Sequence, residues 1–254
     1  MIGVILCKEL LELRRSPVLL LSMISLPATV VAVPVGLLAW AVHAAPEQAL
    51  AFIQEIYGVP ASERAVAGLA SVLARNWLPM FLVLPIFLPI MLASQSIGGE
   101  RERRTLEPLL AAPVSTLSII LGKSLAALLP ALAITWLSAA LFCLGIDAVA
   151  GHPILPDSGW LFATFVLSPL FALFGNATAV VVSSRVLDPR AAQNLAATTV
   201  LPLLALLVVQ LAGRIALGPR FYFELAAGVA AADVALVALA VRLFDRERLL
   251  TLWR

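Results

Sequence analysis

The sequence predicts an all-helical integral membrane protein with six transmembrane helices, organised as a single domain over residues 1–254. The composition is the first reason, because 62% of the residues are hydrophobic and only 13% are charged. A soluble domain has roughly half apolar residues and about a quarter charged ones. The second reason is five charge-free runs of 23 to 27 residues, when about 20 are enough to cross a bilayer as a helix. The alternating segments of about ten residues that mark a transmembrane barrel are absent from the sequence.

Each span follows from these runs, because a backbone in lipid must satisfy its own hydrogen bonds and therefore forms a helix. The sixth apolar stretch is interrupted by Glu224, Asp233 and Arg242, but its middle consists of Ala, Leu and Val and is kept as a span. The first apolar run is too long for a signal peptide, whose apolar region has about 7 to 15 residues. The predicted spans lie at about residues 18–42, 77–97, 121–145, 159–183, 193–213 and 221–243.

Residues 1–15 predict a short amphipathic helix that lies along the membrane interface. Ser16 and Pro17 then end this helix, and the chain turns into the first span. One face of the predicted helix is apolar and another is charged, with Ile2, Leu6, Leu10 and Leu13 on the first and Lys8, Glu12 and Arg15 on the second.

The distribution of basic residues predicts the orientation. With the amino terminus inside, 13 Lys and Arg residues fall on inner segments, and 4 fall on outer ones, namely Arg64, Arg75, Arg214 and Arg220. Basic residues are enriched in cytoplasmic loops, so both termini are expected in the cytoplasm. The longest connection, residues 43–76, is then an outer loop, in which apolar residues at helical spacing suggest two short surface helices.

The most unusual segment is the polar stretch 98–117 between the second and third spans, which faces the cytoplasm in this orientation. Thr105 can cap a helix of about two turns, with Glu107 favourable against the helix dipole. Pro113 would end that helix. Leucines exposed beside charges suit a groove on a partner protein, although the same leucines could instead dip into lipid. The charged residues are Glu100, Arg101, Glu102, Arg103, Arg104 and Glu107, and the exposed leucines would be Leu106, Leu109 and Leu110.

The run from Glu100 to Val114, followed by Leu121-Gly122-Lys123, resembles the first cytoplasmic loop of ABC-2 type transporter permeases. The layout is similar too, with an amphipathic amino-terminal helix, six spans and this loop between spans two and three. The motif covers about 25 residues, and the architecture covers nearly the whole chain. Arg104 is a departure, since many members of the family carry glycine there.

The resemblance implies the membrane-spanning subunit of an ATP-driven exporter that works as a dimer, with a second copy or a homologue, in a bacterial or archaeal plasma membrane. The segment 98–117 would be a coupling helix seated in a cleft of a separate ABC ATPase, and that partner would bind the ATP and Mg. No cofactor is expected in this chain, and no nucleic-acid partner. The residues implied in the ATPase contact are Glu100, Glu102, Thr105, Leu106, Glu107, Leu109 and Leu110.

The sequence itself predicts no enzyme activity. Gly122-Lys123-Ser124 ends like a phosphate-binding loop, but position 117 is Leu where that motif needs Gly, and the segment leads into a membrane helix. The two histidines, His43 and His152, are expected in outer loops and predict no metal site.

Asp233 is predicted near the middle of the sixth span, where a carboxylate costs about 2.5–3.5 kcal/mol on insertion scales. It could contact substrate or a gate, it could be a protonated acid bonded to a neighbouring helix, or the span could lie at a shallower depth. An alternative function is therefore a secondary transporter driven by an ion gradient, with Asp233 as its coupling site. A membrane-embedded enzyme would need clustered His, Asp or Glu, which the sequence does not offer. Nothing in the sequence selects a substrate, although apolar walls favour an apolar or amphiphilic one.

Overall fold

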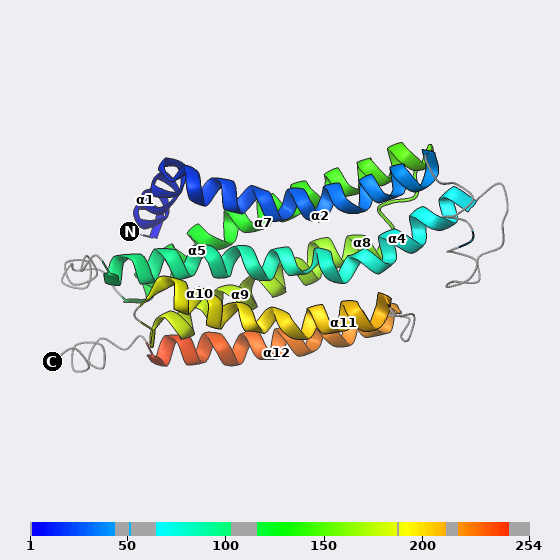
Figure 1. Ribbon diagram of the computed structural model, residues 1–254. Coiled ribbons are helices and arrows are strands. Elements are labelled where there is room, and N and C mark those ends of the chain that lie inside the picture. The colour runs from blue at the N-terminus through cyan, green and yellow to red at the C-terminus, as the bar shows by residue number, and fades with distance from the viewer. Residues whose placement is uncertain are drawn as a thin grey trace.

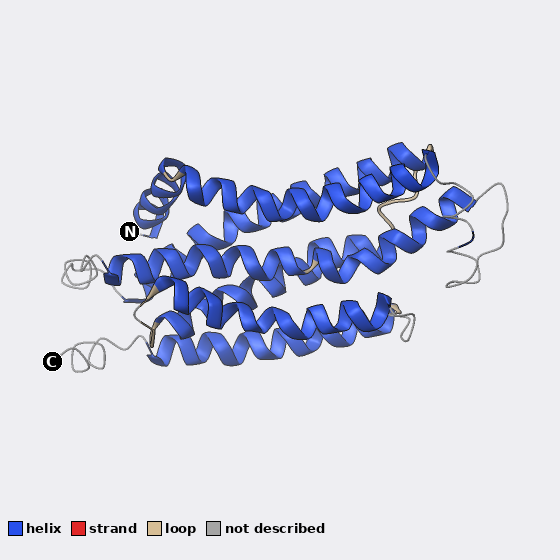
Figure 2. Ribbon diagram, viewed as in Figure 1, coloured by secondary structure: helices blue, strands red, loops and turns tan. Residues whose placement is uncertain are grey.

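Helices and their connections account for all the described residues (Figure 2). The computed structural model describes residues 2–43, 51, 65–102, 116–186, 188–211 and 218–243. The α-helices are α1 (Ile2–Arg15), α2 (Pro17–His43), α4 (Ala65–Phe81), α5 (Val83–Glu102), α7 (Thr116–Ala150), α8 (Ser158–Phe162), α9 (Ser168–Ser183), α10 (Pro189–Ala197), α11 (Leu201–Leu211) and α12 (Pro219–Leu243). A π-helix, η1 (Ala163–Leu167), joins α8 to α9, and a 3-10 turn, η2 (Thr198–Val200), joins α10 to α11.

Six helical stretches are long and apolar enough to cross a membrane, as the sequence predicted. The second, fourth and fifth spans are each built from two or more consecutive helices. The predicted all-helical fold with six spans is therefore confirmed, and the chain is a multi-pass membrane protein. The spans are Pro17–His43, Val66–Ser96, Ser118–Ala150, Ser158–Ser183, Pro189–Gln210 and Arg220–Arg242.

The second span lies at the centre of the bundle. Helices α2 and α7 pack together on one side of it, α9 packs closely along α5, and α12 packs against α9 on the other side (Figure 1). Gly175 of α9 explains the close approach of α5 and α9, because a Cβ atom there would lie 2.3 Å from the carbonyl oxygen of Ile86. Gly175 therefore permits the close packing of these two helices.

Proline explains the break inside the second span. Pro85 has no N–H to donate to the carbonyl of Phe81, four residues earlier, and its ring crowds that carbonyl. Helix α4 accordingly ends at Phe81, Leu82 forms a turn, and α5 starts at Val83. The 3-10 turn η2 in the fifth span has the same origin, since it begins at the residue four positions before Pro202.

The second span also extends beyond the expected range of 77–97. Helix α4 begins at Ala65, so the end of the expected outer loop is helical, and α5 continues to Glu102. The charge-free run stopped at Arg75. The Arg75 side chain is exposed, however, and it leaves the helix uninterrupted. At the chain's start, α1 ends at Arg15 and α2 begins at Pro17, where the sequence places the helix break.

Candidate functional site

The predicted coupling segment 98–117 connects α5 to α7 at one end of the bundle. The start of α1 and the end of α12 lie at the same end (Figure 1). The backbone of Glu100 and Glu102 belongs to the last turns of α5, and α7 begins at Thr116. The other implied contact residues, Thr105, Leu106, Glu107, Leu109 and Leu110, lie outside the described residues.

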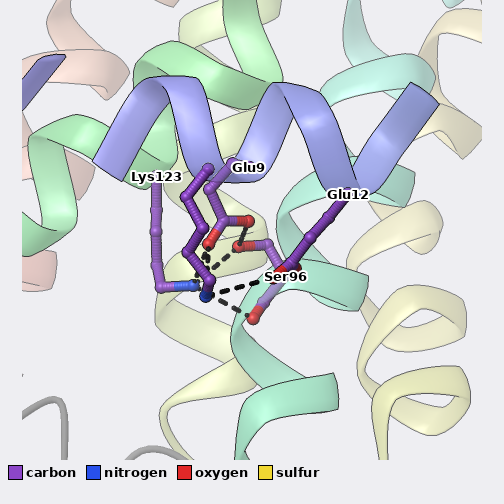
Figure 3. A network of polar contacts seen from close by, with 5 residues as sticks. Glu9, Glu12, Ser96 and Lys123 are labelled. Carbon is purple, nitrogen blue, oxygen red and sulfur yellow. Dashed lines mark hydrogen bonds and ion pairs between the residues drawn. The ribbon is translucent and has the colours of Figure 1, made fainter. Parts of the chain in front are cut away.

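Directly beside this segment, three helices are joined by a polar cluster that we call the α1 junction, formed by Glu9 of α1, Ser96 of α5 and Lys123 of α7 (Figure 3). The Lys123 ammonium donates to Glu9 Oε1 at 2.7 Å and to Ser96 Oγ at 2.9 Å. It also donates to the Ser96 carbonyl oxygen at 3.3 Å. The Ser96 hydroxyl completes the cluster by donating to Glu9 Oε2 at 2.7 Å. Both helices that lead into the coupling segment are thereby tied to each other and to α1.

The α1 junction is buried, which makes its pairing energetically important. The side chains of Lys123 and Glu9 are only 5% and 9% exposed. Burial on its own raises the pKa of the Glu9 carboxyl, but the charges of Lys123 and Lys8 and the hydrogen bonds from Lys123 and Ser96 outweigh it and lower that pKa below its ordinary value. Glu9 is therefore a carboxylate at neutral pH. Removing one partner of such a pair leaves a buried charge uncompensated, at a cost of about 3–5 kcal/mol.

A glycine lets α1 come close enough to form this junction. A Cβ atom at Gly122, next to Lys123, would lie 2.9 Å from the Cβ atom of Ile5 on α1. Ile5 and Glu9 are the two buried residues of α1, one helical turn apart. Gly122 and Lys123 therefore act together, the glycine by admitting the helix and the lysine by pairing with its carboxylate.

Acidification should release α1 from the bundle. Because the pKa of Glu9 lies below its ordinary value of 4.5 in the folded protein, the ionised side chain stabilises docking above that value, and this contribution disappears as the pH falls through the lowered pKa. A nitroxide on Cys7, which is exposed on α1, should be immobile at neutral pH and become mobile as the pH falls through the lowered pKa of Glu9. Its spectrum in a Cys143→Ser background would show this. An unchanged spectrum across that range would contradict the assigned role of Glu9, and a Glu9→Gln variant should show no acid transition.

Sequence reasoning did not single out Glu9 or Ser96, and it considered Lys123 only in the family motif and in a rejected phosphate-binding loop. A signal for Glu9 was available. Glu9 lies three residues after Leu6 and four before Leu13, on the apolar face predicted for this helix. A carboxylate on the apolar face of a helix needs a partner where that face is buried. Ser96 lies in an apolar run and carries no comparable signal.

Asp233 is the other predicted site residue, and the structure buries it. It is 3% exposed on α12, which packs against α9. Neither of its carboxylate oxygens has a hydrogen-bond partner among the described residues. Asn176 on α9 also has a buried side-chain oxygen without such a partner. Asp233 therefore lies at a helix contact, and it does not join the α1 junction.

Gln210 joins two helices by hydrogen bonds. Its side-chain amide donates to Asn76 Oδ1 at 3.2 Å and to the Arg75 carbonyl oxygen at 3.3 Å, linking α11 to α4. Within the described part of the chain, no three His, Cys, Asp or Glu side chains group together in a way that could hold a metal ion.

Comparison with known families decides what this membrane bundle belongs to. The sequence matches the family described as ABC-2 family transporter protein over residues 4–225, which is most of the chain. The chain belongs to the ABC-2 transporter family. This ABC-2 family chain is therefore a membrane transport subunit of a class that generally works with an ABC ATPase. The match includes most of α1 and all of α5 and α7, the three helices of the α1 junction. A search of curated proteins found no significant match.

Proposed function

We propose that this chain is the membrane-spanning permease subunit of an ATP-driven exporter, moved by a separate ABC ATPase that binds the segment between α5 and α7. Membership of the ABC-2 family is the observation that carries this proposal. The α1 junction supports it, because a mechanical input at that segment needs a firm base. That base is a buried, charge-paired contact among the three nearest helices.

The distribution of basic residues supports a cytoplasmic position for this segment. Of the basic side chains that the structure describes, seven lie at the end of the bundle that holds α1, and two, Arg75 and Arg220, lie in the opposite half. Cytoplasmic segments carry the excess of Lys and Arg, so both termini are cytoplasmic in a bacterial or archaeal plasma membrane. The seven are Lys8, Arg14, Arg15, Lys123, Arg185, Arg190 and Arg242.

The chemistry of the segment suits a groove on the ATPase. Leu106, Leu109 and Leu110 fit the apolar anchors of a helix lying in a groove. Glu100, Glu102 and Glu107 would supply a charged rim, and Thr105 would cap the predicted helix. The ATPase supplies the ATP and Mg sites, since the segment around Lys123 lacks the glycine pattern of a phosphate-binding loop.

Movement of the segment would reach the bundle core through α5. The α1 junction makes α1, α5 and α7 move together at their cytoplasmic ends. Helix α5 in turn contacts α9 at the tight Gly175–Ile86 approach, so a tilt of α5 must carry α9 with it. Two such bundles, from this chain and a second copy or homologue, would form the transport path, surrounded by lipid.

Co-purification tests this proposal. The tagged chain, extracted from its native membranes in mild detergent, should bring an ATP-hydrolysing subunit with it. Glu102→Ala together with Leu106→Ala should remove at least most of that subunit, because these changes delete a rim charge and an apolar anchor. A matched control is Glu224→Ala with Leu201→Ala, since both residues are exposed and lie away from the segment.

If no ATPase accompanies the wild-type chain under several mild conditions, the proposal fails. The alternative of an ion-gradient-driven transporter with Asp233 as its coupling site would then take its place. If the ATPase is lost equally from the control variant, the contact is not in the segment between α5 and α7.

A further inference from the structure

Asp233 lies well inside the sixth span. It is 14 residues after the start of α12 at Pro219 and 10 residues before the end at Leu243. At a rise of 1.5 Å per residue, these separations correspond to about 21 Å and about 15 Å along the helix. The structure describes other Asp, Glu, Lys and Arg side chains in the six spans, and each of them lies towards one end of its span.

The surroundings of Asp233 can be placed from two contacts between α12 and the fourth span, which run parallel. The rings of Phe162 and Phe223 lie 4.5 Å apart, and Val180 packs with Ala240. The residue numbers in these two pairs differ by 61 and 60. Asp233 is therefore level with residues 172–173 of α9. Asn176 is one helical turn further along the same helix.

No charge on the packed elements compensates the carboxylate. Helices α9 and η1, which pack against α12, contain no Asp, Glu, Lys, Arg, His, Cys or Tyr. On α12 itself the nearest charged residues are Glu224 and Arg242, nine positions away on either side, or about 13 Å along the axis. An ionised carboxylate buried without a partner or hydrogen bonds is strongly unfavourable.

The chemistry of the site selects its ligand. A calcium or magnesium ion needs about six oxygen ligands, and Asp233 offers one carboxylate beside a mostly apolar helix face. A proton needs one carboxylate and removes its charge. The resulting O–H group is a hydrogen-bond donor, which is what the unpaired side-chain oxygen of nearby Asn176 lacks.

We propose that Asp233 is a proton-binding site inside the membrane, occupied while α12 packs against α9 and able to exchange its proton only when these helices separate. On separation, the carboxylic O–H bond breaks and the proton passes to a water molecule that enters between the helices. The electron pair stays on the carboxylate. The site adds proton exchange to the conformational cycle, whatever energy source drives that cycle.

Infrared spectroscopy of the full chain in phospholipid nanodiscs tests the occupancy. At neutral pH the wild type should show a carboxylic-acid C=O band that shifts on labelling with ¹³C-aspartate, a measurement that needs no variant. Asp233→Asn should remove the band and Asp233→Glu should retain an acid band. Glu224→Gln, which changes an exposed acid on the same helix, should leave the band unchanged. If the wild type has no such band, or if Asp233→Asn keeps it, the proposal is wrong.

Proton exchange in D₂O tests the link to helix separation. A disulfide between Val180→Cys and Ala240→Cys, in a background lacking Cys7 and Cys143, would hold α12 against α9 at their observed contact. The band should take up deuterium when the disulfide is reduced and should take it up much more slowly when the disulfide is formed. Equal rates in the two forms would show that exchange needs no separation. Neither experiment involves an ATPase, so failure here leaves the proposed exporter function standing.

Discussion

Replacing Lys123 by methionine is expected to undock α1 from the bundle. Methionine preserves most of the side-chain volume but leaves Glu9 and Ser96 without their buried cation. Breaking a buried ion pair in this way costs about 3–5 kcal/mol, and α1 can avoid that cost by moving its carboxylate into water. Hydrogen exchange of the full chain in nanodiscs should then show loss of protection in α1, with α9 and α12 unchanged.

Two further variants separate this effect from a general loss of stability. Lys8→Met removes a lysine 3.6 Å from the same Glu9 oxygen, but the Lys8 side chain is 44% exposed, so its effect should be below about 1 kcal/mol. The double variant Glu9→Gln with Lys123→Met has no buried charge to compensate, and it should recover much of the protection of α1. If Lys123→Met leaves α1 as protected as in the wild type, the α1 junction does not hold the helix.

Replacing Gly175 by leucine is expected to prevent close packing of the two central helices. The first added carbon already lies 2.3 Å from the Ile86 carbonyl oxygen and 3.0 Å from its carbonyl carbon. Because these are backbone atoms, the steric clash can be removed only if α5 or α9 moves. Overpacking a core typically costs about 1–3 kcal/mol and occasionally more, and leucine should lie at or beyond the upper end.

Thermal unfolding in detergent measures this effect, with Gly36→Leu as the control. Gly36 lies on α2, and nothing stands within 4 Å of the position its Cβ would take. The control should unfold near the wild-type temperature, and Gly175→Leu well below it. Equal unfolding temperatures for the two variants would contradict the close approach of α5 and α9.

The six spans could be predicted because charges mark their ends in the sequence. The continuity of the second span with the helical end of the outer connection could not, because Arg75 and Asn76 interrupt the apolar run without interrupting the helix. The Arg75 side chain is exposed, and Asn76 accepts a hydrogen bond from Gln210 on a distant helix. A contact between residues 134 positions apart has no local signature.

The candidate site was predictable only in part for a similar reason. The charged segment 98–117 is conspicuous in the sequence, and its family resemblance follows from residues that adjoin one another. The α1 junction instead joins residues that are far apart in the sequence. Ser96 is 87 positions after Glu9, and Lys123 is 114 positions after Glu9. The depth of Asp233 followed from its place in an apolar run. The helix that packs against α12 could not be predicted in the same way, because α12 is rich in alanine and has no dominant apolar face.

Site-specific photo-cross-linking in native membranes tests most directly whether an ATPase acts on the segment between α5 and α7. A photoreactive amino acid would be placed at Leu106 and, as the control, at His152, which is exposed at the opposite end of the bundle. An ATP-hydrolysing subunit should be captured from position 106 and not from position 152. Capture of lipid alone at position 106, or equal capture of the ATPase at both positions, would contradict it.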